Sequence, residues 1–355
     1  MSSWGNRVKI SIFGESHGAA IGVVIDGVEP GLELDMDDIY LNMGRRAPGK
    51  DPAATPRREA DKPNILSGVL NGVTTGAPIC CMIENTNTRS QDYGNLMTKP
   101  RPGHADYTGY IRYHGFNDVR GGGHFSGRLT APLVFAGTIC RQQLKKKGVA
   151  IASHISSVGE IYDSPFNPIK IDDELIHRLN QKSFPLIDES VESEMRALIE
   201  DARMNRDSVG GIIECCATGL EPGLGSPMFE GVESLVSSIM FGVPAVKGVE
   251  FGAGFNITKM RGSKSNDPYR YENGKVITSS NNNGGILGGI TTGMPIIMRA
   301  AIKPTASISQ LQNTVDLNAK ENTTLEVHGR HDPCIVSRAA VVIESALAIA
   351  LANLY

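Results

Sequence analysis

The chain has 355 residues, of which 35 are basic and 38 are acidic, so its formal net charge is −3. Apolar residues make up 40% and charged residues 21%. This composition excludes a disordered chain, because disorder requires low hydrophobicity and a high net charge. The near balance of charge argues against a generic nucleic-acid-binding protein, which is usually basic. We expect a globular protein of about two domain-sized units or one large domain.

Hydrophobic alternation predicts strands over residues 8–13 and 21–26. A helix is predicted to begin after Asp35 and to end near Arg46. Asp35 and Asp38 suit its positive N-terminal end, and Pro48 with Gly49 ends it. The first part of the chain therefore predicts two strands followed by a capped helix.

Apolar residues at helical spacing predict further helices over residues 130–147, 190–205 and 230–241. Thr130 is the expected cap of the first of these, and Gly148 is its expected stop. Residues 260–285 are polar and show no periodicity, so we predict a long functional loop there.

The apolar segment 334–355 carries Arg338 and Glu344. A membrane span has ~20 apolar residues with few charges, so this segment predicts a buried C-terminal helix and no membrane association. The N-terminal residues predict a short strand instead of a secretion signal.

No C-x-x-C pair occurs, so we expect no metal site. Adjacent cysteines in apolar strands are typical of reduced core residues in a cytoplasmic protein. The cysteines are Cys80, Cys81, Cys140, Cys215, Cys216 and Cys334.

Two short sequences occur twice in the same order. Residues 27–32 (GVEPGL) match residues 219–224 (GLEPGL) at five of six positions, and residues 72–79 (GVTTGAPI) match residues 289–296 (GITTGMPI) at six of eight. We predict two related halves, roughly 1–150 and 208–355, within a single domain covering residues 1–355. The alternative is chance reuse of common turn residues.

Two histidines lie in turns that contain glycine. His17 lies between Gly14 and Gly18 at the end of a predicted strand, and His104 follows Gly103. A histidine on such a turn is a candidate general acid near neutral pH. The alternative for His17 is a histidine held within a turn by local hydrogen bonds, and the alternative for His104 is a surface turn.

Residues 120–128 (RGGGHFSGR) form a glycine-rich segment before the helix expected from Thr130. Backbone amides can converge there on an anion, and the helix N-terminus adds a positive dipole. The segment matches neither the P-loop nor the Rossmann pattern. It predicts an anion site, with a flexible loop as the alternative.

Residues 303–307 and 329–333 bring a base, hydroxyls and Asp332 close to the last helix. The alternative for Asp332 is a helix cap. A basic set, Arg45, Arg46, Arg57 and Arg58, is interleaved with proline and glycine. A solvated charged surface is the usual explanation for such a set, and in a protein of near-neutral charge this pattern also raises the expectation of a ligand with several anionic groups. These segments predict an enzyme for a small phosphorylated and carboxylated substrate, but they do not identify the reaction.

The chain resembles the chorismate synthase family over essentially its whole length. Residues 14–30 are similar to the N-terminal signature of that family, and residues 101–107 are similar to its second histidine motif. Residues 330–334, with Glu344, are similar to its C-terminal signature. Further similar segments are residues 90–93, 246–250 and 284–289.

The resemblance implies an α+β fold, a β-α-β sandwich of two pseudo-symmetric antiparallel-sheet units with helices outside. It also implies a carbon–oxygen lyase of aromatic amino-acid biosynthesis. The reaction would be the 1,4-anti elimination of phosphate from 5-enolpyruvylshikimate 3-phosphate to give chorismate, which needs reduced FMN without net redox change.

By the same resemblance, His17 would donate a proton to the leaving phosphate, His104 would act near flavin N1, and Asp332 would act near flavin N5. The implied FMN contacts are His124, Phe125, Ser126, Pro244, Ala245, Gly288, Lys303, Pro304, Thr305, Ala306, Ser307 and Arg330. The implied substrate or NADP contacts are Arg46, Arg57, Arg58, Arg101 and Arg128. Many members read Arg-Ser-Ser-Ala-Arg where this chain reads His124 to Arg128 (HFSGR).

The resemblance further implies a cytoplasmic homotetramer that receives reduced FMN from an external flavin reductase, with NADPH as an alternative reductant. Two rivals stay open. One is an FMN oxidoreductase whose flavin ends in a changed redox state. The other is a non-catalytic protein that binds an anion or RNA, against which the charge balance and the lack of interleaved aromatic residues argue.

Overall fold

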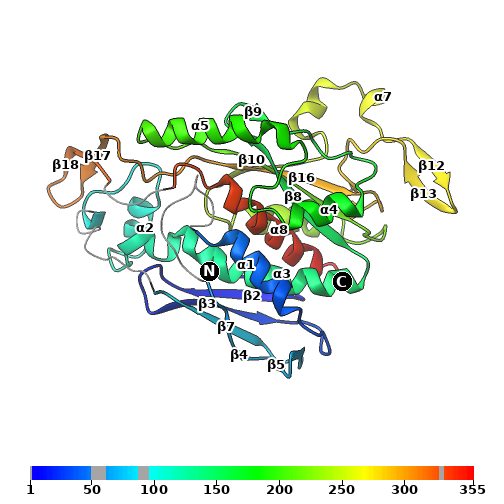
Figure 1. The fold of residues 1–355 in the computed structure, drawn as a ribbon, viewed down its shortest axis with the longest axis horizontal. Helices are drawn as coiled ribbons and strands as arrows, with labels where there is room; N and C mark the ends of the chain where they lie inside the picture. Colours follow the sequence, from blue (N-terminus) through cyan, green and yellow to red (C-terminus); the bar gives the residue numbers. More distant parts are fainter. Residues whose placement is uncertain (1, 49–60, 87–95, 328–331) are drawn as a thin grey trace.

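The computed structural model describes residues 2–48, 61–86, 96–327 and 332–355. Within these residues, two five-stranded antiparallel sheets enclose a layer of helices (Figure 1). This arrangement confirms the predicted α+β class with antiparallel sheets. None of the helices in the described part of the chain has the length and hydropathy that crossing a bilayer requires.

The first sheet has the order β1-β2-β3-β7-β4. Alternate residues of its central strand, Ile21, Val23 and Ile25, are fully buried against the helices, which is the period-two pattern of a sheet with one face on the core. The strands are β1 (Ser3–Trp4), β2 (Lys9–Gly14), β3 (Ala20–Asp26), β4 (Asn64–Ser67) and β7 (Ile79–Glu84), and a small hairpin joins β5 (Val69–Leu70) to β6 (Val73–Thr74).

The second sheet has the order β11-β16-β10-β8-β9. Its strands are β8 (Ala150–Val158), β9 (Ile161–Tyr162), β10 (Gly211–Thr218), β11 (Val246–Phe251) and β16 (Ile296–Ile302). Three small hairpins lie outside it: β12 (Tyr269–Glu272) with β13 (Lys275–Thr278), β14 (Ile286–Leu287) with β15 (Ile290–Thr291), and β17 (Gln312–Asp316) with β18 (Glu321–Leu325).

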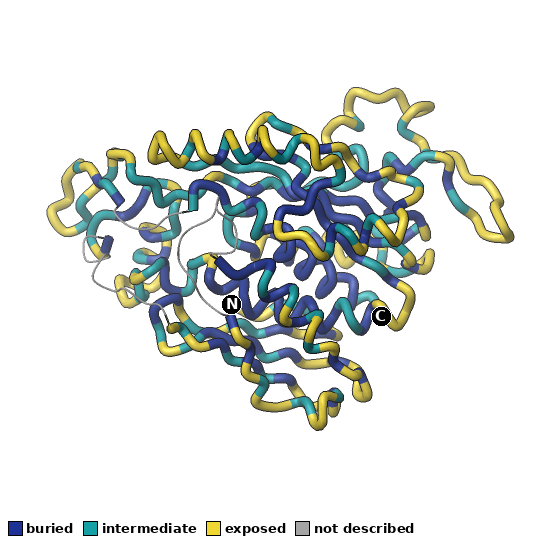
Figure 2. The backbone as a smooth tube through the Cα atoms, in the orientation of Figure 1, coloured by how far each residue is buried: buried dark blue, intermediate teal, exposed yellow. Residues whose placement is uncertain are grey.

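Two long helices, α3 (Thr130–Lys146) and α8 (Val336–Ala352), pack against each other between the sheets. Helix α3 contacts β3, and α8 contacts β8 and β10. Helix α8 is buried along nearly its whole length (Figure 2), as predicted for the C-terminal segment. The same layer holds α1 (Met36–Arg46), which contacts α3, and α6 (Val232–Met240), which contacts α8.

The helix placement therefore differs from the expectation of helices outside the sandwich. Helix α4 (Asp173–Asn180) does lie outside, because it packs with Cys216 on one face of β10, whereas the neighbouring Cys215 faces the central helices. Helix α5 (Glu192–Met204) contacts β8. The short helices α2 (Asp106–Arg112) and α7 (Gly262–Ser265) lie in connecting segments. A helix apolar on all sides, such as α8, is buried by two layers instead of one.

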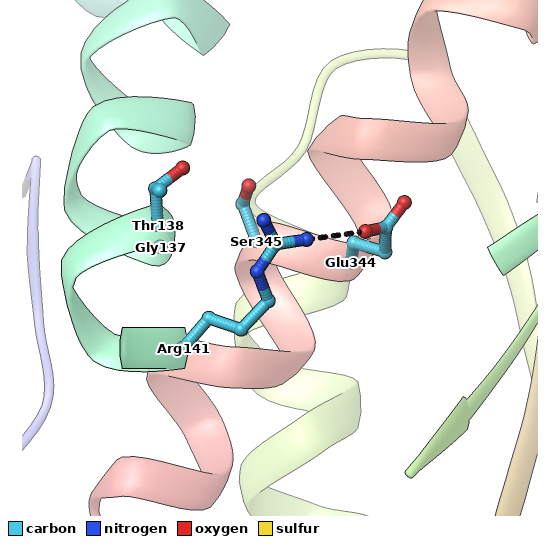
Figure 3. A pocket seen from close by; sticks show the side chains of 5 residues that line it. All are labelled: Gly137, Thr138, Arg141, Glu344 and Ser345. Atoms are coloured by element: carbon cyan, nitrogen blue, oxygen red, sulfur yellow. Dashed lines mark hydrogen bonds and ion pairs between the residues drawn. The ribbon is translucent and has the colours of Figure 1, made fainter. Parts of the chain in front are cut away.

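The crossing of α3 and α8 depends on a glycine. A Cβ atom on Gly137 would lie 2.3 Å from Cβ of Ser345, so a larger residue could not occupy that position. Beside this contact, Arg141 of α3 points toward Glu344 of α8 (Figure 3), and Nη1 of Arg141 lies 3.0 Å from Oε1 of Glu344. The small crevice there is lined by none of the predicted site residues.

Local signals place most of these elements correctly. The carboxylate of Asp35 accepts a hydrogen bond from the amide of Asp38 at 3.0 Å, as predicted for the start of α1. Thr130 does not cap α3; Leu129 is the cap residue, and the Thr130 hydroxyl donates to the carbonyl of Gly127 at 2.6 Å. A residue inside the first turn has helical backbone angles, so its side chain cannot serve as the cap.

The long loop predicted over residues 260–285 contains α7 and the hairpin of β12 and β13. Its turn is Asn273-Gly274, and both residues have positive φ angles, 49° and 76°. Asn-Gly is the favoured pair for such hairpin turns, so this dipeptide was the sequence signal for the hairpin.

The two sheets have corresponding strand orders. The order β2-β3-β7-β4 in one corresponds to β8-β10-β16-β11 in the other. In the first half the Thr74 hydroxyl accepts from the amide of Leu32 at 2.9 Å, and in the second half Thr291 accepts from Leu224 at 2.9 Å. We propose that the halves are related units. Taken by sheets, the second unit includes β8 and so begins near residue 150.

Candidate active site

The glycine loop 121–123 lies against both predicted site histidines. A Cβ atom on Gly121 would be 2.1 Å from Nδ1 of His17, and a Cβ atom on Gly122 would be 3.2 Å from Nε2 of His104. All three glycines have positive φ angles, 60°, 85° and 54°, a conformation that other residues rarely adopt. Their small size and backbone freedom therefore let two distant histidines approach one loop.

His17 lies in the turn after β2 and is 8% exposed. The side-chain amide of Asn85 holds this turn, because its nitrogen donates to the carbonyls of Glu15 and Gly18, each at 2.9 Å. The Asn85 oxygen in turn accepts from Nε of Arg128 at 3.1 Å. Residues from three separate segments thus fix the position of the His17 turn.

His104 precedes α2 and is bound to Asp106. Its Nδ1 atom lies 2.5 Å from Oδ1 of Asp106, and the same carboxylate accepts from Nε and Nη2 of Arg101, each at 2.7 Å. Nη1 of Arg101 donates to the Ser307 hydroxyl at 3.0 Å. Burial works against the charge on Asp106, but the hydrogen bonds from Arg101 and His104 lower its pKa well below the usual range.

Ser307 belongs to a segment that lies beside His104. A Cβ atom on Gly103 would be 3.7 Å from Cβ of Ala306 and 3.9 Å from Nζ of Lys303. The Lys303 amide donates to the carbonyl of Ala245 at 2.9 Å, and Ala245 has a positive φ of 74°. Burial, with the charge of Lys247, lowers the pKa of Lys303. Two of the predicted cofactor segments, residues 244–245 and 303–307, therefore meet here beside the His104 turn.

Thr305 has a hydroxyl oxygen that is buried and has no hydrogen-bond partner among the described atoms. The hydroxyl of Ser208 donates to the carbonyl of Thr305 at 2.8 Å. The residue after Ser208, Val209, donates its amide to the carbonyl of Pro333 at 2.8 Å. The segment that carries Asp332 is thus joined to residues 303–307 through this two-residue link.

Asp332 forms an ion pair with Arg338 in the first turn of α8. Helices α3 and α8 run in the same direction, since Gly137 lies beside Ser345 and, further on, Lys147 lies over the ring of Tyr355. Their N-termini therefore share one end of the sandwich (Figure 1). This places Asp332 at the end of the molecule where the glycine loop precedes α3.

Arg46 and Arg128 share one buried counter-ion, Asp61, and form ion pairs with its two oxygens. The side chains of the arginines are 5% and 3% exposed. Nε of Arg46 also donates to the Thr130 hydroxyl at 3.1 Å. Burial opposes the charge on Asp61, but the two guanidinium groups lower its pKa. Two of the predicted substrate arginines, Arg46 and Arg128, are therefore fixed in position by a buried carboxylate.

The remaining predicted site residues are distributed as follows. Nδ1 of His124 donates to the carbonyl of Gly14 at 2.8 Å, so His124 anchors the glycine loop to β2. The ring of Phe125 lies 6.2 Å from that of Tyr113, centroid to centroid. The hydroxyl of Ser126 accepts from the amide of Arg128 at 3.3 Å. Pro244 precedes Ala245, and Pro304 lies against Gly210.

Gly288 does not join this cluster within one chain. It lies in the hairpin of β14 and β15, where the carbonyl of Gly289 accepts from the amide of Val232 at the start of α6. Ala245 follows the C-terminal end of α6, and Lys303 follows β16. The hairpin that holds Gly288 and the segment that holds Ala245 and Lys303 thus lie at opposite ends of β16. Its seven residues span about 20 Å at ~3.3 Å per residue. Arg57, Arg58 and Arg330 lie outside the described residues.

Sequence reasoning missed three residues of this site, Asp61, Asn85 and Asp106. Asp106 stands two residues after His104 and could have been found from that spacing, because a carboxylate beside a histidine is a common orienting partner. Asp61 and Asn85 gave no local signal. Within the described ranges, no group of three or more His, Cys, Asp or Glu side chains is arranged to hold a metal ion.

Comparison with known proteins gives a consistent family. The family model for chorismate synthase matches residues 8–355. A chorismate synthase of Dehalococcoides mccartyi is 46% identical over 99% of this chain and 96% of that protein. One from Thermococcus kodakarensis is 45% identical over 98% and 96%. A crystal structure of chorismate synthase is similar with a TM-score of 0.78 and 27% identity, covering 99% of this chain and 92% of that one.

Proposed function

We propose that the residues around the glycine loop 121–123 carry the reaction of the chorismate synthase family, to which the chain belongs. This family is a group of carbon–oxygen lyases that eliminate phosphate from 5-enolpyruvylshikimate 3-phosphate to give chorismate. The observation that carries the proposal is the approach of His17 and His104 to adjacent glycines of one loop. Both imidazoles are then within reach of one small substrate.

The family uses reduced FMN, and we propose that this chain binds it beside residues 103, 245 and 303–307. The unpartnered Thr305 hydroxyl supports this, because a buried hydroxyl is costly unless a ligand or water satisfies it. Beside this hydroxyl's segment, Gly103 and Ala306 are small residues, and Nζ of Lys303 supplies a positive charge 3.9 Å from the Cβ position of Gly103. When bound, reduced FMN supplies the electron density that loosens the phosphate ester of the substrate.

The chain's own residues would then position the substrate and transfer protons. His17 would donate a proton to the leaving phosphate from its fixed turn. His104 would exchange a proton through Nε2, the ring nitrogen nearest the glycine loop. Asp332, with Arg338 as its counter-ion, would be the third proton-transfer residue. Arg46, Arg101 and Arg128 would attract the substrate's anionic groups, and Arg57, Arg58 and Arg330 stay predictions for the same role.

We also propose a cytoplasmic homotetramer supplied with reduced FMN by an external flavin reductase. All six cysteines are free thiols, which suits a reducing compartment. Large apolar side chains such as Met228 and Phe229 are 77% and 86% exposed, which suits contacts between subunits. Direct use of NADPH stays a prediction. Sedimentation of the purified chain tests the assembly, and a monomer at micromolar concentration would exclude it.

The direct test is an oxygen-free incubation with reduced FMN and 5-enolpyruvylshikimate 3-phosphate. Phosphate release and chorismate absorbance should rise together, with many products formed per flavin and no electron acceptor consumed. Stoichiometric oxidation of the flavin would instead indicate the rival FMN oxidoreductase. Binding of the substrate without phosphate release would indicate the non-catalytic alternative.

A further inference from the structure

His104, which is partly buried, and Asp106, which is buried, form a hydrogen-bonded pair at the start of α2. The Asp106 side chain is 4% exposed and that of His104 is 19% exposed. Arg101 approaches the carboxylate with two side-chain nitrogens at 2.7 Å and with its backbone amide at 3.0 Å. A carboxylate held by a bidentate arginine and a backbone amide is fixed in both position and charge.

The donor and acceptor roles follow from that charge. An ionised carboxylate only accepts hydrogen bonds, and the low pKa of Asp106 keeps it ionised. Nδ1 of His104 therefore carries the hydrogen in the 2.5 Å contact with Oδ1. Nη2 of Arg101 also lies 3.1 Å from Nδ1 and 3.4 Å from Nε2, but its shortest contact is the 2.7 Å hydrogen bond that it donates to Oδ1. In neutral imidazole the other nitrogen is then unprotonated, and that nitrogen, Nε2, is the one beside Gly122.

We propose that Asp106 is the positioning residue of His104: it holds the hydrogen on Nδ1, fixes the plane of the ring, and leaves Nε2 as the atom that exchanges a proton at the glycine loop. Arg101 serves this unit by orienting Asp106, and its bond to Ser307 joins the unit to the segment 303–307. This inference rests on the proposed function only where it concerns the rate of the reaction.

The first test measures the ring of His104 directly. In protein labelled with ¹⁵N-histidine, the ring nitrogens of His104 are assigned by comparison with the variant His104→Gln. In the neutral form of the wild-type ring, Nδ1 should be protonated and Nε2 unprotonated. The opposite tautomer in the wild-type protein would overturn the proposal, whatever the enzyme's activity.

The second test is the variant Asp106→Asn, whose side chain has the same shape but lacks the charge. Its amide can donate as well as accept, so the neutral His104 ring should shift toward the Nε2–H form. Turnover should fall by ~100-fold or more, the range of a misplaced proton-transfer group. The double variant Asp106→Asn with His104→Gln should be no slower than His104→Gln alone.

A matched control exists elsewhere in the fold. Asp163 accepts from Nδ1 of the buried His154 at 2.7 Å, outside the site. Asp163→Asn should lower stability but keep the turnover of folded enzyme. Asp106→Glu keeps the charge and should preserve the Nδ1–H form and recover part of the turnover.

The two failures are distinguishable. If the wild-type enzyme makes no chorismate, the proposed function fails while the tautomer measurement still decides the role of Asp106. If it makes chorismate and Asp106→Asn keeps both the Nδ1–H tautomer and near-normal turnover, Asp106 is structural only. If Asp106→Asn does not fold, the wild-type spectrum and Asp106→Glu carry the test.

Discussion

Gly121 lies directly against the imidazole of His17: a Cβ atom on Gly121 would be 2.1 Å from Nδ1 of that ring. Gly121→Ala should therefore displace His17 or the loop, and the φ of 60° adds backbone strain. We expect turnover to fall by ~10-fold or more, since small displacements of a reacting group are costly. Steady-state assays with reduced FMN measure the effect.

Gly127→Ala is the matched control in the turn that follows the glycine loop. A Cβ atom on Gly127 would have no heavy atom within 4 Å, so this variant should keep wild-type turnover. Equal losses in both variants would show that the loop, and not the contact with His17, sets the rate.

His17→Ala should retain FMN binding and lose most of its turnover. Removal of a proton donor costs ~10²–10⁴ in rate, whereas the proposed FMN segment is formed by other residues. Flavin titration and the oxygen-free assay separate the two properties. The exposed His177 on α4 gives the control His177→Ala, and unchanged turnover in His17→Ala would remove His17 from the mechanism.

Asp61→Asn should destabilise the protein, because two buried arginines lose their shared counter-ion. Breaking a buried ion pair costs about 3–5 kcal/mol. Since the pKa of Asp61 is lowered in the fold, its contribution is present above its usual pKa and is lost as pH falls through the folded value. Urea unfolding near pH 7 should show the full difference from wild type, and the difference should shrink in acid.

The exposed Asp37 of α1 provides the control for that experiment. Asp37→Asn should change the free energy of unfolding by only a few tenths of a kcal/mol. An Asp61→Asn variant as stable as this control would contradict the role of Asp61 as a shared counter-ion.

A second buried network lies outside the site. Nδ1 of His154 is 2.7 Å from Asp163, Nε2 is 3.0 Å from Glu214, and Glu214 reaches Arg299 at 3.2 Å. Burial opposes the charges, but the hydrogen bonds among them raise the pKa of His154 and lower the pKa values of Asp163 and Glu214.

His154→Gln should therefore lower the free energy of unfolding by about 3–5 kcal/mol near pH 6. The stabilisation from His154 is present below its usual pKa and is lost as pH rises through the raised value, while that from the two carboxylates is lost in acid. Denaturant unfolding from pH 4 to 9 should show the largest difference near pH 6. A difference independent of pH would contradict the charged network, and His177→Gln is the exposed control.

Much of the fold follows from local patterns. The alternation in β3, the Asp35 cap of α1 and the apolar run of α8 each involve residues close together in the chain, so periodicity and capping rules identify them. The hairpin at Asn273 also has a local signal, because Asn-Gly is the favoured pair for a turn with two positive φ angles. The placement of helices between the sheets could not be read this way, because local periodicity shows that a helix is buried but not by which layers.

The amino-acid order specifies the family motifs, the two histidine turns and the glycine loop, because each is a short contiguous pattern. Long-range packing decides their partners. Asp61 neutralises Arg46 and Arg128 from distant segments, and the glycine loop brings His17 to His104. A buried charge takes as its partner whichever side chain the assembled layers bring within hydrogen-bond distance, and no local periodicity encodes that choice.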